Sequence, residues 1–406
     1  MIGDTNRVEV AIADRVWIDL FDRVAPFWLN TIPHRRHRLR GAVGEDGSVR
    51  RHAPKSTVLT ARVTWAFASI YRHTGDRSAL ALAERAATEL LERHVDSQHG
   101  GVYWSIDARR RPLRRHKHMY AQAFAIYAFT EMHLATRNLR WWDAARSLLS
   151  AVTAGLLDGR GGLIECADEK WVPVTGQCLG RADDETARVS TNTLIHIVEA
   201  LANSVRADLG DDARQLLGDH LALLAEHALH VGGHGMHQWF DSRWRPLGDP
   251  TVTSPGHDLE AAWLLHDAAG LVNDPALHAT WRDIGRGLVS GALSRGLDRD
   301  GGVLALVGTE QQRQALTWWA QAEGLAGFCW AAAQGDERAA DAAQRLWLLI
   351  DTHFVSDGPG DWARALDNDR RRVPGGLAIG PWECPYHVVR TELGVLVRAG
   401  RLAPIG

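Results

Sequence analysis

The segment HGGVYWSID at His99–Asp107 is the clearest copy of a loop motif that organises the whole chain. In this motif glycines precede an apolar residue, and the sequence contains five further variants: EDGSV at Glu45–Val49, DGRGGLIE at Asp158–Glu165, GGHGMHQWFD at Gly232–Asp241, DRDGGVLAL at Asp298–Leu306 and DGPGDWARALD at Asp357–Asp367. Neighbouring copies are roughly 60–70 residues apart, which is enough for two helices and their turns. Each repeat therefore predicts a helical hairpin.

The segments between these loops have the periodicity of amphipathic helices, and strand patterns are scarce. Apolar residues recur at helical spacing in Thr57–Arg72, Tyr120–Leu134, Asn192–Val205 and Leu259–Leu271. Six hairpins can stack as an open solenoid, but that architecture usually has shorter and more uniform repeats. We therefore predict an all-α protein, an (α/α)6 barrel of twelve helices with glycine-rich loops at the mouth of the active site. No linker-like tract divides the chain, so residues 8–403 are expected to form one domain.

Composition narrows the class of protein. The chain has 406 residues, of which 45% are hydrophobic and 23% are charged, as in a soluble globular protein. It lacks an apolar stretch of about 18 residues, so no membrane-spanning segment is expected. The formal net charge of −3 gives no reason to expect nucleic acid or an anionic membrane as a partner. The N-terminal segment lacks the pattern of an export signal and the four cysteines form no CxxC pair, so we expect a cytoplasmic protein.

Tryptophan is unusually frequent. The 17 tryptophans outnumber the eight phenylalanines and five tyrosines. A tryptophan side chain offers a flat face on which a sugar ring can stack and an N–H that can bind a hydroxyl. Most of these residues should pack between helices, and we expect about a quarter of them to contact a ligand.

Polar and aromatic residues recur on the helix that follows each loop. In chain order they are Arg62; Tyr120; Asn192 and His196; His257 and Glu260; Trp318, Trp319 and Glu323; and His387 and Arg390. Burial of polar groups without partners is costly, so helices that carry them should face water or a ligand. If the ring closes, all six clusters converge on its axis, which is typical of a small-molecule site.

Six longer stretches carry a family resemblance. They are KSTVLTARVTWAFASIYRHTGD, KHMYAQAFAIYAFTEMHLAT, NTLIHIVEALA, SPGHDLEAAWLLHDAA, TWWAQAEGLAGF and PWECPYHVVRTEL. In this order they resemble the N-acylglucosamine 2-epimerase superfamily, which contains cellobiose 2-epimerases, mannose 2-epimerases and mannose isomerases. The resemblance implies an (α/α)6 barrel. It also implies a sugar 2-epimerase for free reducing aldoses such as D-mannose and D-glucose, or for a β-1,4-linked disaccharide such as cellobiose. Aldose–ketose isomerisation of D-mannose to D-fructose is the alternative.

The resemblance also implies roles for individual residues. The catalytic centre of the family falls on Arg62, His257 and His387. Its substrate-contacting positions fall on Tyr120, Asn192, His196, Glu260, Trp318, Trp319 and Trp382. We count His196 with the catalytic residues, as a helper in ring opening or an anchor for a hydroxyl. Glu323 is included with the substrate-binding residues, and a buried acid that ties inner helices together is its alternative role.

These residue types suit epimerisation at C2. Ring opening exposes an aldehyde that acidifies the C2 proton, and loss of that proton gives a planar cis-enediolate. Since the pKa of histidine lies near working pH, His257 and His387 are expected to exchange the proton on opposite faces of the sugar. Arg62 is expected to stabilise the charge on O1 and O2, and Glu260 to orient or activate His257. This chemistry requires a small-molecule sugar substrate and neither cofactor nor metal ion. A monomer or homodimer is expected.

Other interpretations of the same residues are open. His257, Glu260 and His266 have H-x-x-E-x5-H spacing, which offers a metal site, although His266 is rotated off the His257 face. Glu260 and Glu323 offer the carboxylate pair of a glycoside hydrolase or lyase. A non-catalytic binding protein on the same barrel is a third alternative. The basic run Arg109–Lys117 can attract phosphate, but we expect it to be a surface or subunit-contact feature.

Overall fold

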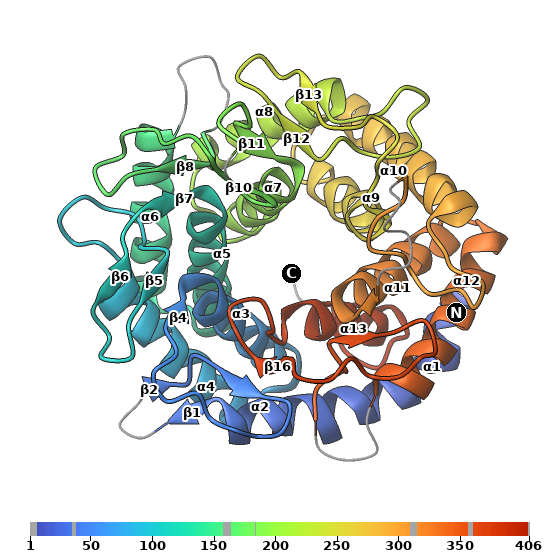
Figure 1. Ribbon diagram of the computed structural model, residues 1–406, viewed down its shortest axis with the longest axis horizontal. Helices are drawn as coiled ribbons and strands as arrows, with labels where there is room; N and C mark the ends of the chain where they lie inside the picture. The colour runs from blue at the N-terminus through green and yellow to red at the C-terminus, as the bar shows by residue number, and fades with distance from the viewer. Residues whose placement is uncertain are drawn as a thin grey trace.

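The computed structural model describes residues 6–34, 38–156, 164–182, 184–308, 315–355 and 360–404. Within these ranges, twelve helical rods form two concentric rings (Figure 1). The inner ring consists of α3 (Thr57–Thr74), α5 (Met119–Thr136), α7 (Thr191–Arg206), α9 (Pro255–Ala269), α11 (Trp318–Ala333) and α13 (Tyr386–Arg398). The first rod of the outer ring is continuous and consists of α1 (Arg7–Ile18), η2 (Asp19–Val24) and α2 (Ala25–Thr31). The other five outer rods are α4 (Arg77–Glu89) with η3 (Leu90–His94), α6 (Leu139–Leu156), α8 (Asp211–His227), α10 (Pro275–Arg295), and α12 (Glu337–Leu349) with η4 (Ile350–Phe354).

The inner ring is closed. Each inner helix packs against the next one along the chain, and α13 packs against α3. Each inner helix from α3 to α11 also packs against the outer helix that follows it, and α13 packs against α1. The prediction of an (α/α)6 barrel is therefore confirmed, whereas the domain limits of 8–403 stay a prediction.

Short strands at the loop end of the barrel were not predicted. They are β1 (Pro33–His34), β2 (Arg38–Leu39), β3 (Val43–Gly44), β4 (Lys55–Ser56), β5 (Ser105–Ile106), β6 (Pro112–Arg114), β7 (Lys117–His118), β8 (Cys166–Ala167), β9 (Gln177–Cys178), β10 (Arg181–Ala182), β11 (Val189–Ser190), β12 (Trp239–Phe240), β13 (Pro246–Leu247), β14 (Leu316–Thr317), β15 (Ala365–Leu366) and β16 (Leu377–Ile379). Segments of two or three residues are too short for an alternating pattern to reveal them.

These strands join successive repeats around the ring. The segment before an inner helix pairs, antiparallel, with the segment after the next outer helix: β4 pairs with β5, β7 with β8, β11 with β12 and β14 with β15. A single bridge between Thr253 and Val307 takes this place before α9. β16 pairs with β3 and so links the last repeat to the first. The rim of the barrel is thus held at every junction by backbone hydrogen bonds.

The glycine motif has a structural reason. The side chain of Gln122, on α5, accepts a hydrogen bond from the Val102 N–H at 2.7 Å and donates one to the Val102 carbonyl at 2.8 Å. Gln321, on α11, holds Val303 in the same way. Gly101 has a φ of 70°, and a Cβ there would lie 2.9 Å from the Gln122 Oε1 atom. Glycine is therefore needed where the loop turns towards the inner helix.

Two copies of the motif are described only in part. Residues 158–163 of the third copy and 357–359 of the sixth lie outside the described residues. The remaining copies all precede an inner helix, as predicted.

Local sequence sets where the inner helices begin. The Ser56 side chain caps α3 by accepting a hydrogen bond from the Leu59 N–H at 2.9 Å, and Ser190 caps α7 through the Thr193 N–H at 3.2 Å. Because the inner helices lie between the barrel interior and the outer ring, they are buried on nearly all sides, as α5 is from Met119 to Leu134. None of the helices in the described ranges combines the length and apolar character needed to cross a bilayer.

Candidate active site

A cavity of about 300 Å³ lies at the N-terminal ends of the inner helices. Ten of the eleven predicted site residues line it: Arg62, Tyr120, Asn192, His196, His257, Glu260, Trp318, Trp319, Trp382 and His387. All six inner helices contribute, and Trp382 comes from the loop before α13. Because helix N-termini carry partial positive charge, this end of the barrel favours a ligand that is or becomes anionic.

Several buried polar atoms on the cavity residues lack a hydrogen-bond partner within the described chain. They are Arg62 Nε, Asn192 Oδ1, His257 Nδ1, Glu260 Oε2 and Trp318 Nε1. A buried polar atom without a partner is costly, so such atoms mark places where a ligand can complete the hydrogen bonding. The set contains donors and acceptors, as recognition of sugar hydroxyls requires.

Arg62 provides a buried positive charge. Its Nη2 donates to the Tyr120 hydroxyl at 2.7 Å, and its guanidinium lies 4.3 Å from the centre of the Phe124 ring. Within the described ranges it forms no ion pair with a carboxylate, in contrast to Arg390. Burial opposes this charge, but the neighbouring Tyr120 and Cys384 groups hold the pKa of Arg62 above its ordinary value. The charge is therefore available to a ligand in the cavity.

His257 and His387 face the same cavity from two inner helices. The Trp319 ring lies close to both histidines: its centre is 4.7 Å from the centre of the His257 ring and 6.0 Å from the centre of the His387 ring. Burial lowers the pKa of His257 to about 4. Burial, reinforced by Arg62, also holds the pKa of His387 well below its ordinary value. Both imidazoles are therefore neutral bases in the free site.

Glu323 is the predicted site residue that does not line the cavity. It lies behind His387, where its Oε1 is 2.7 Å from the histidine Nδ1. The indole N–H of Trp263 donates to the other oxygen at 3.3 Å. The expectation that Glu323 contacts substrate is therefore corrected, since the carboxylate is fully occupied by neighbouring inner helices. Its alternative role, a buried acid between helices, agrees with this position.

Arg390 joins three buried carboxylates behind the cavity. Its guanidinium binds Glu199, Glu260 and Glu323, one from each of three other inner helices. In the described chain Glu260 Oε1 accepts from Arg390, and no hydrogen bond joins Glu260 to His257. The Glu260 charge nevertheless raises the pKa of His257 against the effect of burial, so its expected role in activating this histidine stays a prediction.

His196 joins the same buried network through Glu199. Its Nδ1 lies 3.0 Å from Glu199 Oε2, and the Tyr386 hydroxyl donates to the same oxygen. Burial opposes the charge of Glu199, but Arg390 and His196 hold the pKa of this carboxyl below its ordinary value. Glu199 was missed in the sequence, although its spacing from His196 places both residues on one helix face.

Tryptophans form much of the cavity wall. Four of the 17 line it: Trp239, Trp318, Trp319 and Trp382. Whether these four contact a ligand, as expected for about a quarter of the tryptophans, stays a prediction, and Trp239 is a lining residue that the sequence did not predict. Trp239 lies in the fourth glycine motif, and its indole N–H donates to the Leu179 carbonyl at 2.8 Å. Trp382 is 38% exposed and extends the aromatic wall to the mouth of the cavity.

Two clusters have donor sets that could hold a metal ion. Donor atoms of Glu260, Glu323 and His387 lie within 4.8 Å of one another, but the Arg390 guanidinium already binds both carboxylates. The H-x-x-E-x5-H set is not assembled, because His266 stacks on His278, with ring centres 4.4 Å apart, and does not line the cavity.

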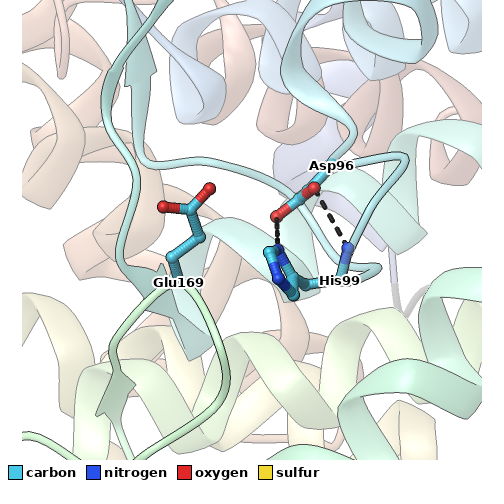
Figure 2. Close-up of side chains that lie close together, drawn as sticks. All are labelled: Asp96, His99 and Glu169. Carbon is cyan, nitrogen blue, oxygen red and sulfur yellow. Dashed lines mark hydrogen bonds and ion pairs between the residues drawn. The ribbon is translucent and has the colours of Figure 1, made fainter.

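The second cluster lies outside the active site. Figure 2 shows Asp96 and His99 together on one loop with Glu169 opposite them. The ammonium of Lys117 lies 2.6 Å from Asp96 Oδ2 and supplies the positive charge there. Lys117 is itself fully buried. This end of the basic run Arg109–Lys117 is therefore not a surface feature, whereas Arg109, Arg111, Arg114 and Arg115 are exposed.

Comparison with known proteins agrees with this geometry. Residues 41–391 match the family model of N-acylglucosamine 2-epimerase. A cellobiose 2-epimerase of Bacteroides fragilis is 30% identical over 374 residues, which cover 91% of this chain and 94% of the relative. The structure of cellobiose 2-epimerase from Bacillus thermoamylovorans superposes with a TM-score of 0.88 at 26% identity, over 96% of this chain and 99% of that chain.

A D-mannose isomerase structure, with a TM-score of 0.78 over 92% of this chain and 95% of that chain, is 19% identical and shows a shared fold alone. The comparisons therefore favour 2-epimerisation over aldose–ketose isomerisation. The chain belongs to the N-acylglucosamine 2-epimerase family and is a carbohydrate epimerase, an enzyme of the isomerase class.

Proposed function

We propose that the protein epimerises the reducing-end glucose of a β-1,4-linked disaccharide such as cellobiose at C2. The observation that carries the chemistry is the meeting of two buried neutral histidines and one unpaired guanidinium at a single cavity. The disaccharide is supported by the aromatic wall, which continues outward along Trp239 and Trp382 and can stack a second sugar. Free D-mannose and D-glucose are the second substrate class.

Catalysis begins with ring opening. His257 accepts the proton of the anomeric hydroxyl while the C1–O5 bond breaks, and His196, acting in its imidazolium form, passes its Nε2 proton to O5. His196 suits this role because its Nδ1–H is held by the Glu199 carboxylate while its Nε2–H is left for the sugar. The step leaves a free aldehyde at C1 and a protonated His257.

Epimerisation follows on the open chain. The Nδ1–H of neutral His387 donates to Glu323, so the Nε2 lone pair is directed at the substrate and removes the C2 proton. Protonated His257 then delivers its proton to the opposite face of C2. Ring closure returns the O5 proton to His196 and moves the His387 proton to O1, so all three histidines regain their starting states. Glu323 acts as a positioning residue, because it fixes the tautomer of His387 and stabilises the imidazolium as it forms.

Arg62 stabilises the intermediate between these two transfers. The enediolate carries negative charge on O1 and O2, and Arg62 is the cavity cation without a carboxylate partner in the described chain. The positive ends of the inner helices add to this field without reorganisation. A hydrolase is not supported, because Glu260 and Glu323 are both bound by Arg390 on one side of the cavity and do not flank a glycosidic bond.

We further propose that the enzyme acts without a metal ion or cofactor, as a monomer or homodimer in the cytoplasm, with neither nucleic acid nor membrane as a partner. The four cysteines are buried and free, which supports a reducing compartment.

The test is incubation with cellobiose, mannose, glucose and fructose in D2O. We expect deuterium at C2 of the epimer, with cellobiose turned over faster than the monosaccharides. Deuterium at C1 of a ketose would identify an isomerase, and faster turnover of mannose would overturn the disaccharide assignment. Absence of exchange on all four sugars would refute the proposed reaction.

A further inference from the structure

A second and larger cavity lies away from the active site. It measures about 870 Å³ and is lined by β1, β2, the segment 49–55 and the turn between β5 and β6. These elements lie on the outer edge of the ring beside α4 (Figure 1). None of its lining residues lines the active-site cavity, so the epimerase chemistry does not use it.

The charge of this cavity has one sign. Its lining contains Arg38, Arg40, Arg50, Arg51, Lys55 and Arg109. No aspartate or glutamate of the described chain is among the lining residues. A cleft lined by charges of one sign focuses their field and concentrates counter-ions.

One of these cations, Lys55, is neutralised by a buried carboxylate. Lys55 forms a buried ion pair with Glu89, whose second oxygen accepts the Leu39 N–H at 2.9 Å. Glu89 is fully enclosed and is not part of the cavity wall. The pair anchors the floor of the cavity, and it leaves the charges of the arginines above it uncompensated.

The five arginines form no ion pair within the described residues. Arg40 is the most constrained of them, because its Nη1 donates to the Thr31 carbonyl while its Nε is buried without a hydrogen-bond partner. Arg50, Arg51 and Arg109 are exposed at the rim. Repulsion among unpaired guanidinium groups is unfavourable, so an anion in their midst would be held strongly.

We propose that this cavity binds a small anion that carries two or more phosphate groups and no nucleobase. Guanidinium groups match the geometry of phosphate oxygens and bind them through paired charge-assisted hydrogen bonds. Five unpaired cations require more negative charge than one phosphate provides, and the volume exceeds that of the active-site cavity. No tryptophan, tyrosine or phenylalanine is among the described lining residues, so a base could stack only on the smaller rings of His34 and His52 or on a guanidinium.

Binding is tested by isothermal titration calorimetry of the full chain with inorganic pyrophosphate at low ionic strength. The test variant is the triple substitution Arg50→Gln, Arg51→Gln, Arg109→Gln, whose residues are exposed and remote from the active site. The control, Arg286→Gln, Arg299→Gln, Arg338→Gln, changes the net charge equally on other exposed surfaces. Arg40→Gln tests the half-buried Arg40 separately. Circular dichroism and epimerase turnover show whether each variant is folded.

We expect one pyrophosphate per chain, bound more tightly than phosphate or citrate. The test variant should lose affinity by at least about tenfold, as expected when charge-assisted hydrogen bonds are removed, with turnover unchanged and the control unaffected. No binding, or an equal loss in the control, would overturn the site. Equal affinity for citrate would overturn its preference for phosphate. Tighter binding of ATP than of tripolyphosphate, or of RNA than of pyrophosphate, would overturn the assigned ligand class.

Discussion

Replacement of Arg62 by glutamine should abolish most of the activity with little effect on the stability of the fold. Arg62 is 2% exposed and carries a positive charge that no carboxylate of the described chain neutralises. The substitution keeps a side chain that can hydrogen-bond the Tyr120 hydroxyl, and it removes the charge that we assign to the enediolate. Activity is therefore expected to fall far more than stability.

The contacts of the guanidinium indicate how much activity and how much stability the substitution should cost. Loss of one preorganised charge donor reduces kcat by about 10²–10³, or about 2.7–4 kcal/mol of transition-state stabilisation. The fold loses the cation–π contacts of the guanidinium with Phe124, Tyr386 and Tyr120, whose ring centres lie 4.3, 4.8 and 5.6 Å away and which contribute up to about 2 kcal/mol each at a desolvated site. It also escapes the desolvation cost of the buried charge, which opposes this loss. Because the surroundings hold the pKa of Arg62 above its ordinary value, the melting temperature should stay the same or fall slightly.

Steady-state epimerisation of cellobiose measures kcat and KM, and thermal unfolding by circular dichroism measures stability. Arg72→Gln is the matched control, since Arg72 lies on the same helix but pairs with Glu131 at 2.9 Å. It should lower stability and leave kcat unchanged. A kcat for Arg62→Gln within about tenfold of wild type would refute the electrostatic role of Arg62.

Four further results are expected. Glu323→Gln should lower kcat and leave KM nearly unchanged in steady-state assays, because Glu323 touches His387 but not the cavity; a change confined to KM would contradict this. Since burial lowers the pKa of His257 to about 4, a pH profile of kcat/KM should rise through about pH 4 to a plateau, and an acid limb near 6.5 would show that the base is another group. Burial lowers the pKa of His94 and His118 from 6.5 to about 3, so the unfolded chain takes up protons first as pH falls. Their contribution to the free energy of unfolding is complete above pH 6.5 and declines from there towards pH 3. The urea midpoint should therefore be lower at about pH 4.5 than at about pH 7, and equal midpoints would contradict this prediction. Dialysis against a chelator should leave turnover intact, and a loss restored by added metal would support a metal at Glu260, Glu323 and His387.

Much of the candidate site could be located from the sequence because it follows the repeat. Once each glycine loop is placed before an inner helix, the polar residues of that helix fall at one end of the barrel. The sequence was a poorer guide to which side chains form hydrogen bonds or ion pairs with one another. Glu260 stands three residues after His257, yet its carboxylate turns to Arg390 on another helix. Glu323 was expected to contact substrate and instead lies behind His387. Neither choice can be inferred from spacing along one helix.

The barrel could be predicted from the sequence because hydrophobic periodicity and the glycine motif are local properties that recur with every hairpin. The same repeat indicated which residue types meet at the axis. Three features became clear only from the folded chain: which carboxylate contacts which histidine, which cation of the described cavity lacks a carboxylate partner, and how β16 and β3 close the rim. Those outcomes depend on the rotation of each helix and on competition between side chains from distant repeats, and both are settled by packing after the ring has closed.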